Sequence, residues 1–328
     1  MKSTENRREF LSKVALLAAM PPGLIGLSMG RRGRPMEPPG ASAVAVVKAA
    51  SYNEDLAGAV ERGIRACGLA VKGKRILLKP NLVEFSPAAP VNTNVAVVAA
   101  ALEAFERLGA EEVRIGEGPG HRRDTLYLAQ EADYRHLDQF ERRFVDLNRD
   151  NVTLTPGFVG LNDIYLPDTA LTADLIVSIP KMKTHHWVGA TLSMKNLFGL
   201  VPGAIYGWPK NHLHYSGISE SIVALNRIFR RTFAIVDGIV GMEGDGPIQG
   251  TAKPAGVLVM GSDLVAVDAT CCRIMGLDPE RVDYLMHASA YGHLLTERIE
   301  QRGEPVAAVQ TDFSLRQEFQ HLRLAALR

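Results

Sequence analysis

Short apolar runs alternate along the chain with segments that have helical periodicity. The runs typical of buried strands cover residues 43–48, 75–79, 112–115, 175–179, 232–236 and 256–260. Between them, Val98, Ala101, Leu102, Phe105 and Leu108 recur at the spacing of one helix face, and Gly109 follows where such a helix would end. This alternation predicts an α/β fold with a mostly parallel or mixed sheet and helices on both faces, and it leaves room for two subdomains with a cleft between them.

Polar residues at the ends of these runs predict where the helices begin. Asn53 is expected to cap a helix through Cys67, the stretch Asn92-Thr93-Asn94 a second helix, and Asp278 a third. Further helices are expected from Arg122, between 218 and 231, and between 265 and 275, with a short one starting near 190. Residues 143–166 are typical of short strands and turns. We expect residues 44–312 to form the α/β domain and residues 313–328 an amphipathic helix or a loose tail.

The first 43 residues have the pattern of an export signal. Arg7 and Arg8 precede Phe10 and Leu11, which resembles the twin-arginine signal closely, and Ala41-Ser42-Ala43 offers a small-residue cleavage site. The apolar run 14–30 is short and is interrupted by two prolines, so it does not predict a stable membrane span. We therefore expect export through the twin-arginine translocon to the periplasm. Retention of the segment as an uncleaved anchor is the alternative.

Charge and cysteine content argue against two classes of function, nucleic-acid binding and iron–sulfur electron transfer. The chain has 37 basic and 36 acidic residues; without residues 1–43, which carry seven basic and three acidic ones, 30 and 33 remain. This balance does not favour a nucleic-acid partner. Three cysteines without a C-x-x-C motif predict no four-thiolate iron–sulfur cluster. Cys67, Cys271 and Cys272 are expected to pack as small apolar residues, with a disulfide from Cys67 as the alternative.

The segment 178–203 gathers most of the candidate chemistry. It contains Lys181, Lys183, His185, His186, Lys195 and Asn196, with few acidic residues nearby, directly after the apolar run 175–179. On an extended backbone Lys181, Lys183 and His185 share one face, where their charges repel unless an anion or an acid lies among them. The segment therefore predicts a site for a small anion, with a solvated basic loop as the alternative.

Acidic residues in the second half suggest a balancing or metal-binding role. Asp237, Glu243 and Asp245 lie in a glycine-rich stretch after the run 232–236 and are oxygen donors suited to Mg²⁺ or Ca²⁺. Pairing with the lysines, or turn formation by Asp-Gly, are the alternatives. His185-His186 together with His212 and His214 are also weighed as a transition-metal site. G-E-G-P-G, from Gly116 to Gly120, favours a tight turn over a nucleotide cradle, with Glu117 facing the site.

Five motifs together resemble the family called domain of unknown function 362. They are K-P-N (79–81), P-K-M-K-T-H (180–185), S-M-K-N-L-F-G-L-V-P-G (193–203), V-D-G-I-V-G-M-E-G-D-G-P (236–247) and D-L-V-A-V-D-A (263–269). The resemblance covers about residues 44–312 and implies a shared site built from these motifs, without a settled activity. Some members carry an iron–sulfur module with cysteine clusters. This chain lacks those cysteines, so no electron-transfer role is carried over.

These observations define a candidate site. Lys79, Asn81, Lys181, Asn196 and Glu117 are expected to bind the ligand, and Lys183, His185 and Lys195 to act in catalysis, because crowded cations give lysines lowered pKa values suited to proton transfer. Asp237, Glu243 and Asp245 would hold a divalent metal. The predicted function is binding, and transformation, of a small anionic metabolite. A non-catalytic ligand- or metal-binding protein and an accessory protein of a periplasmic redox system are the alternatives.

Overall fold

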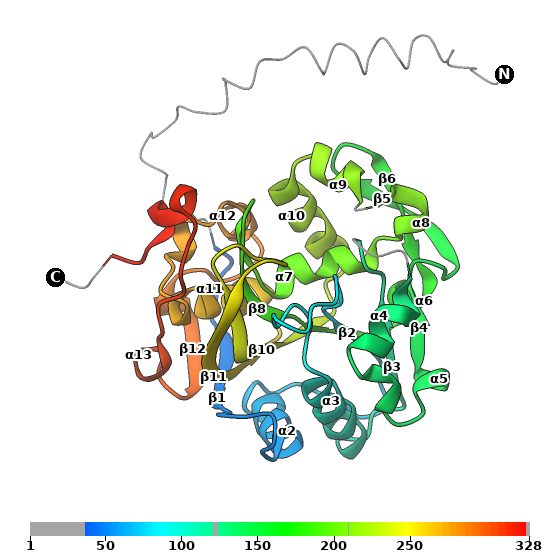
Figure 1. The fold of residues 1–328 in the computed structure, drawn as a ribbon, viewed down its shortest axis with the longest axis horizontal. Helices are drawn as coiled ribbons and strands as arrows, with labels where there is room; N and C mark the ends of the chain where they lie inside the picture. Colours follow the sequence, from blue (N-terminus) through cyan, green and yellow to red (C-terminus); the bar gives the residue numbers. More distant parts are fainter. Residues whose placement is uncertain (1–36, 121–123, 209, 326–328) are drawn as a thin grey trace, which may run out of the picture. The chain divides into compact units, whose positions relative to one another are not determined.

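A mixed β-sheet runs through the computed structural model, which describes residues 37–120, 124–208 and 210–325 (Figure 1). The strands of its main path, in spatial order, are β12 (Ile299–Gly303), β1 (Ser42–Lys48), β11 (Thr251–Gly261), β10 (Thr232–Glu243), β7 (Leu175–Ile179), β2 (Arg75–Pro80), β3 (Glu112–Glu117) and β4 (Phe144–Asp146). β8 (Lys181–His185) pairs with β10 and with β9 (Gly189–Thr191). β5 (Val152–Phe158) and β6 (Asn162–Pro167) form a separate hairpin.

The strands from β10 to β4 are parallel to their neighbours, whereas β11 runs antiparallel to both β10 and β1. The parallel strands are apolar almost throughout because both faces of the sheet are covered, and all five residues of β7 are buried. Their carboxyl ends meet at one edge of the sheet. That edge receives the polar residues that follow the apolar runs.

Helices cover the two faces and separate two apolar cores. α2 (Leu56–Ala66) and α3 (Val95–Arg107) pack on one face, below the sheet in Figure 1, against Ile76, Leu78 and Val177. The opposite face carries α7 (Ser193–Asn196), α10 (Ile218–Ile228), α11 (Leu264–Ile274) and α12 (Asp283–Ala288). The remaining helices are α4 (Thr125–Glu131), α5 (Phe140–Arg143), α6 (Asp168–Thr172), α8 (Gly203–Tyr206), α9 (Asn211–Tyr215) and α13 (Val306–Val309).

The fold class predicted from the sequence is confirmed: the chain is α/β, with a mostly parallel sheet and helices on both faces. A second subdomain is not observed, since the described residues form one unit. The Asn94 cap is observed, because its side chain accepts from the Ala96 amide; the first helix, however, begins after Asp55 and not after Asn53. β10 is also longer than expected. It extends to Glu243, because the glycines after Asp237 pair with β11 and do not form a loop.

Both ends of the described chain are joined to the sheet. Strand β1 starts at Ser42, whose hydroxyl donates to Asp263 at 2.8 Å, so the ordered fold begins before residue 44. After residue 312, where an amphipathic helix or a loose tail is expected, the described chain packs against the domain. Phe313 is fully buried, and the 3₁₀ helix Gln317–Leu322 ends on a buried Leu322. The twin-arginine motif and the run 14–30 lie outside the described residues.

Within the described ranges, no helix has the length and apolar character needed to cross a membrane. The three cysteines are free thiols: Cys271 and Cys272 are buried in the core on α11, and Cys67 is half-buried. Burial raises the pKa of all three thiols, so they pack as apolar groups.

Candidate functional site

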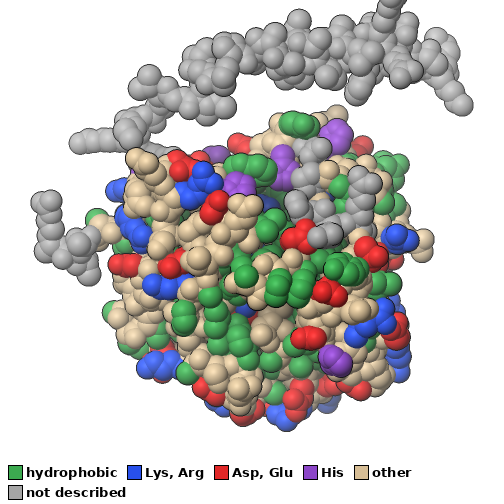
Figure 2. All heavy atoms as spheres, viewed as in Figure 1, with side chains coloured by type: hydrophobic (Ala, Val, Ile, Leu, Met, Phe, Trp, Pro, Cys, Tyr) green, Lys and Arg blue, Asp and Glu red, His purple; other side chains and the backbone are tan. Residues whose placement is uncertain are grey.

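A cavity of about 310 Å³ lies at the carboxyl edge of the sheet, where β2, β3 and β8 end. Its wall is completed by the segment around α7 and by α9, so residues distant in sequence meet there. Figure 2 shows several histidine side chains in the upper part of the face in view. The polar and aromatic residues that line the cavity are Lys79, Asn81, Glu117, Lys183, His185, His186, Trp187, Thr191, Lys195, Asn196, Phe198, Lys210 and His214.

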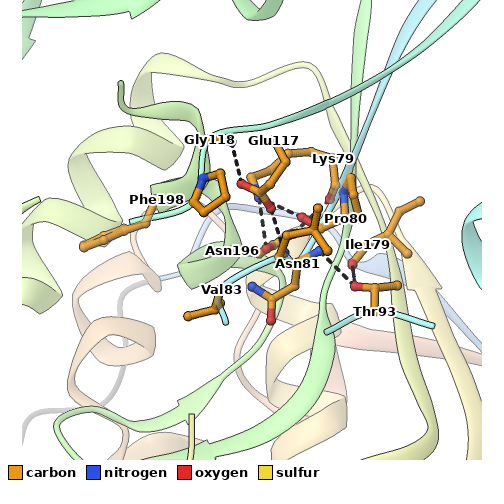
Figure 3. Close-up of polar contacts among 12 residues, drawn as sticks. Lys79, Pro80, Asn81, Val83, Thr93, Glu117, Gly118, Ile179, Asn196 and Phe198 are labelled. Carbon is orange, nitrogen blue, oxygen red and sulfur yellow. Dashed lines mark hydrogen bonds and ion pairs between the residues drawn. The ribbon is translucent and has the colours of Figure 1, made fainter. Parts of the chain in front are cut away.

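A buried ion pair forms the floor of this site (Figure 3). Lys79 Nζ donates to Glu117 Oε2 at 2.6 Å, to its neighbour Pro80 O at 2.7 Å and to Asn196 Oδ1 at 3.2 Å. Asn196 in turn donates to Lys79 O and to the Ser178 hydroxyl, which fixes the amide. Burial lowers the pKa of Lys79, although the Glu117 carboxylate acts in the opposite direction. This pair neutralises the only carboxylate among the described residues of the cavity wall.

Lys183 lies in the same wall and has no acidic partner in the part of the chain that the structure describes. Its amine donates to two backbone carbonyls, Val91 O at 2.8 Å and Pro247 O at 3.2 Å, and its side chain is fully buried. Burial, assisted by the charges of Lys181 and Lys195, lowers the pKa of Lys183 well below its ordinary value. Without a bound anion, the cavity therefore disfavours a proton on this amine.

For Lys195 and Lys210, too, burial disfavours the charged form of the amine. Burial, followed by the charge of Lys79, lowers the pKa of Lys195 from 10.5 to about 7. Burial also lowers the pKa of Lys210 to about 7, although its amine donates to Gly118 O at 2.6 Å and Phe198 O at 2.7 Å. A lysine in this range is present in both protonation states at neutral pH, so it can act as a base, an acid or a nucleophile.

Two histidines of the cavity wall, His185 and His214, are poor cations. His185 Nδ1 accepts from the Trp187 amide at 3.0 Å, so the proton of the neutral ring lies on Nε2. Burial, together with the charge of Lys195, lowers the pKa of His185 well below 6.5. His214 Nδ1 lies 3.1 Å from Lys210 O, and burial lowers its pKa as well. At neutral pH these rings offer hydrogen-bond donors and acceptors, not charge.

Two buried polar atoms in the wall have no partner among the described residues. They are Asn81 Oδ1 and the Thr191 hydroxyl, in side chains that are 6% and 5% exposed. An unsatisfied buried polar group costs about 1–3 kcal/mol, so such groups are uncommon unless a ligand completes them. The cavity thus presents an acceptor and a hydroxyl in addition to its amines.

Helix α7, which carries Lys195 and Asn196, is held by a carboxylate from the opposite half of the chain. Asp268 of α11 accepts from the Ser193 and Met194 amides at 2.8 and 3.0 Å and from the Ser193 hydroxyl. The Ser178 hydroxyl at the end of β7 donates to Ser193 O. These contacts explain why D-L-V-A-V-D-A and S-M-K-N belong to one site, although Asp268 does not line the cavity.

Lys181, predicted as a ligand-binding residue, lies outside the cavity wall. Its amine forms an ion pair with Asp237 at 2.5 Å and donates to the Tyr52 hydroxyl at 2.9 Å. Asp237 also accepts from the Asn94 amide at the start of α3. Lys181, Lys183 and His185 lie at alternate positions of β8, but the buried Asp237 carboxylate neutralises the charge of Lys181. The pair is part of the core beside the site.

The predicted metal triad is not assembled. The Asp237 carboxylate accepts hydrogen bonds from Lys181 and Tyr52. Glu243 accepts from the Ser314 amide, and Asp245 forms an ion pair with Arg316. Trp187 lies between the rings of His186 and His214, at 4.7 and 5.1 Å, while His212 packs on Tyr206. Across the described ranges, no group of three His, Cys, Asp or Glu residues is arranged to hold a metal ion.

Of the remaining predicted residues, Lys79, Asn81, Glu117, Lys183, His185, Lys195 and Asn196 all meet at the cavity. The sequence interpretation did not include Lys210, Thr191 or Gly199. Lys210 lies in a stretch rich in aromatic and small residues with no acid nearby, which is the criterion that singled out residues 178–203. The same criterion, extended by a few residues, would have found it.

Sequence comparison places the chain in a family. The family described as "Domain of unknown function (DUF362)" matches residues 76–273. The chain belongs to this family. It is 28% identical over 214 residues to a thylakoid-associated protein of Synechocystis sp., an alignment that covers 64% of this chain and 65% of the relative. The chain therefore spans just under two thirds of the length of that relative.

Two solved structures share part of the backbone arrangement with this DUF362 protein. One is the lactate racemase apoprotein from Thermoanaerobacterium thermosaccharolyticum, with a TM-score of 0.46 and 13% identity over 71% of this chain and 57% of that one. The other is a protein from Thermotoga maritima, with a TM-score of 0.34 and 13% identity over 63% and 55% of the two chains. Neither likeness bears on the chemistry of the cavity.

The position of Lys181 predicts a structural role for its amine. In Lys181→Met the Asp237 carboxylate stays buried without its ion-pair partner, which should lower the free energy of unfolding by about 3 kcal/mol. Urea unfolding would measure this, and Lys72→Met on an exposed lysine is the control. Unchanged stability would show that the pair does not support the core.

Gly199 is predicted to be required by the ion pair on the cavity floor. A Cβ atom there would overlap both Glu117 Oε1 and Lys79 Nζ, neither of which has room to move. Gly199→Ala should therefore cost about 1–3 kcal/mol of stability. Gly120→Ala, whose new carbon would meet Lys210 Cε at an ordinary 3.4 Å, is the control from the same cavity. Equal stability of the two variants in urea would contradict this explanation.

Proposed function

We propose that this DUF362 protein binds a small organic anion in the cavity at the carboxyl edge of its sheet. The observation that carries the proposal is a charge imbalance among the described residues of the wall. They contribute four lysine amines (Lys79, Lys183, Lys195 and Lys210) and a single carboxylate, which is already paired with Lys79. Desolvation disfavours the charged form of Lys183, Lys195 and Lys210 in the empty cavity. An anion supplies the missing counter-charge and makes protonation favourable again.

The unpartnered polar atoms support an organic anion over a bare halide. The Thr191 hydroxyl can donate to an anionic oxygen, and Asn81 Oδ1 requires a donor such as a hydroxyl or an amine on the ligand. The neutral His185 ring adds a donor at Nε2. Together these groups match a carboxylate or phosphate compound that carries a second polar group. A cavity of about 310 Å³ suits a molecule of metabolite size.

The twin-arginine motif supports a proposal about the compartment in which the protein works. Arg7 and Arg8 precede the apolar run 14–30, and we propose that the protein works after export from the cytoplasm. Fusion of residues 1–43 to a reporter would test this, with Arg7→Lys and Arg8→Lys together as the control. Export of the reporter that does not depend on the two arginines would overturn the assignment.

Anion binding is predicted to take up protons, with a defined pH dependence. Lys195 and Lys210 have pKa values of about 7 in the empty cavity and are mostly neutral above that pH. An anion that binds their protonated forms should bind most tightly below pH 7. Its affinity should then fall about tenfold per pH unit above pH 7 for each proton taken up.

Calorimetry with acetate, oxalate and inorganic phosphate, in buffers of different ionisation enthalpy, would measure both affinity and proton uptake. Lys195→Met should weaken binding at least about tenfold, and Lys72→Met should not change it. Tight binding with no proton uptake, or equal affinity in Lys195→Met, would overturn the proposed site.

Burial of the Lys195 amine is also predicted to lower the free energy of unfolding of the ligand-free protein. Its folded-state pKa of about 7 lies below the ordinary 10.5, so its unfavourable contribution is complete below pH 7 and fades between pH 7 and 10.5. Lys195→Met should therefore stabilise the ligand-free protein by about 1 kcal/mol at pH 6, and by less at pH 9. Urea unfolding at both values would test this. A variant less stable than the parent at pH 6 would contradict it.

A further inference from the structure

Lys195 differs from the other lysines of the cavity in having no polar partner among the described residues. Lys79 is bound to Glu117, and Lys183 and Lys210 each donate to two backbone carbonyls. The amine of Lys195 instead lies 3.8 Å from the centre of the Phe198 ring. To react with a ligand, Lys183 or Lys210 would have to give up two hydrogen bonds, whereas Lys195 would give up none.

The surroundings of Lys195 are those of a reactive amine. Lys195 is half-buried and lines the cavity, and it belongs to α7, whose first backbone amides are held by Asp268 of α11. Burial, followed by the charge of Lys79, lowers the pKa of this amine to about 7, and the cationic wall attracts an anionic group toward it. An unprotonated lysine next to an anion-binding wall is suited to attack a carbonyl carbon of the bound anion.

We propose that Lys195 forms an imine with a small carbonyl compound that carries an anionic group, with 2-oxo acids as the ligand class. This inference rests on the proposed anion site and names its substrate chemistry. It extends the role of Lys195 from binding to covalent chemistry. The carboxylate of the oxo acid would be held by the cationic wall, while the carbonyl group points toward the free amine.

The step is balanced without an oxidant or a reductant. The nitrogen lone pair forms a bond to the carbonyl carbon, and the electron pair of the C=O double bond moves to oxygen. Transfer of the first proton from nitrogen to this oxygen gives a neutral carbinolamine. Nitrogen then loses its second proton as the C=N double bond forms and the hydroxyl leaves as water. One water molecule is the only product besides the imine. The protonated forms of neighbouring lysines can supply the proton that the departing hydroxyl needs.

Two orphaned groups of the cavity match this intermediate. The carbinolamine carries a new hydroxyl group, which is both a donor and an acceptor. Asn81 Oδ1 needs a donor, and the Thr191 hydroxyl has no partner among the described residues. A ligand whose carbonyl oxygen becomes a hydroxyl group during the reaction would therefore provide the donor for Asn81 Oδ1 that a simple carboxylate lacks.

The experiment traps the imine by reduction. The full protein is incubated at pH 7.5 with glyoxylate and cyanoborohydride, and the modified lysine is identified by peptide mass spectrometry. We expect one predominant adduct at Lys195, formed on the order of 10- to 100-fold faster than on exposed lysines such as Lys72. Acetaldehyde, which has the carbonyl group without the anion, should label Lys195 at least about tenfold more slowly. Acetate should slow the reaction with glyoxylate by competition.

Matched variants separate covalent chemistry from binding. Lys195→Arg keeps a positive charge but cannot form an imine, so it should bind acetate in calorimetry and show no predominant adduct. Lys72→Met should behave like the parent protein. Thermal unfolding of each variant checks that it is folded, and the site of labelling in the parent protein does not depend on any variant.

The outcomes distinguish this inference from the anion site on which it rests. Acetate binding with labelling spread evenly over surface lysines, or concentrated on Lys183 or Lys210, would overturn the imine at Lys195 and leave the anion site intact. Absence of both acetate binding and a predominant adduct would overturn both. A predominant adduct at Lys195 that acetate does not slow would support the reactive amine and contradict the anion site.

Discussion

The removal of lysine amines from water is the constraint on which the rest of this site depends. A buried ammonium ion is unfavourable unless a counter-charge or hydrogen-bond acceptors replace its hydration. The protein meets this demand in three ways: a carboxylate for Lys79, backbone carbonyls for Lys183 and Lys210, and only an aromatic ring for Lys195. The pKa of each amine is lowered in all three cases, so the cavity retains an unmet preference for negative charge.

The fold makes this arrangement possible because its parallel strands end together. β2 delivers Lys79 and β3 delivers Glu117, and pairing of β2 with β3 and β7 fixes the distance between those strand ends. Helix α7 then closes the cavity from above the sheet, with its first amides held by Asp268. Gly199 lets the following segment approach the ion pair closely, since any side chain there would overlap it. The lysines are thus positioned by rigid elements, which prevents them from relaxing into solvent.

Much of this could be read from the sequence, and the errors have physical reasons. Apolar runs located most strands of the sheet, and the polar residues that follow them identified Lys79, Glu117, Lys183 and Lys195 correctly as neighbours in space. The glycines after Asp237 were misleading, because strand β10 continues through them by pairing with β11. Pairing of Asp237 with a lysine was one of the alternatives, but the sequence alone does not decide between that ion pair and a metal site. Whether a lysine faces a carboxylate depends on tertiary contacts, and so Lys181 and the three carboxylates of the supposed metal site were misplaced.

The buried ion pairs Lys181–Asp237 and Lys79–Glu117 have similar geometry but different surroundings. Lys181 and Asp237 join β8, β10, Tyr52 and the start of α3, and every charge in that group has a partner. Lys79 and Glu117 are paired just as closely, but Glu117 must also balance Lys183, Lys195 and Lys210 around the same cavity. One carboxylate cannot neutralise four amines. A core that required stability alone would place apolar residues at those positions, so the excess of lysines is best explained by a ligand that brings the missing negative charge.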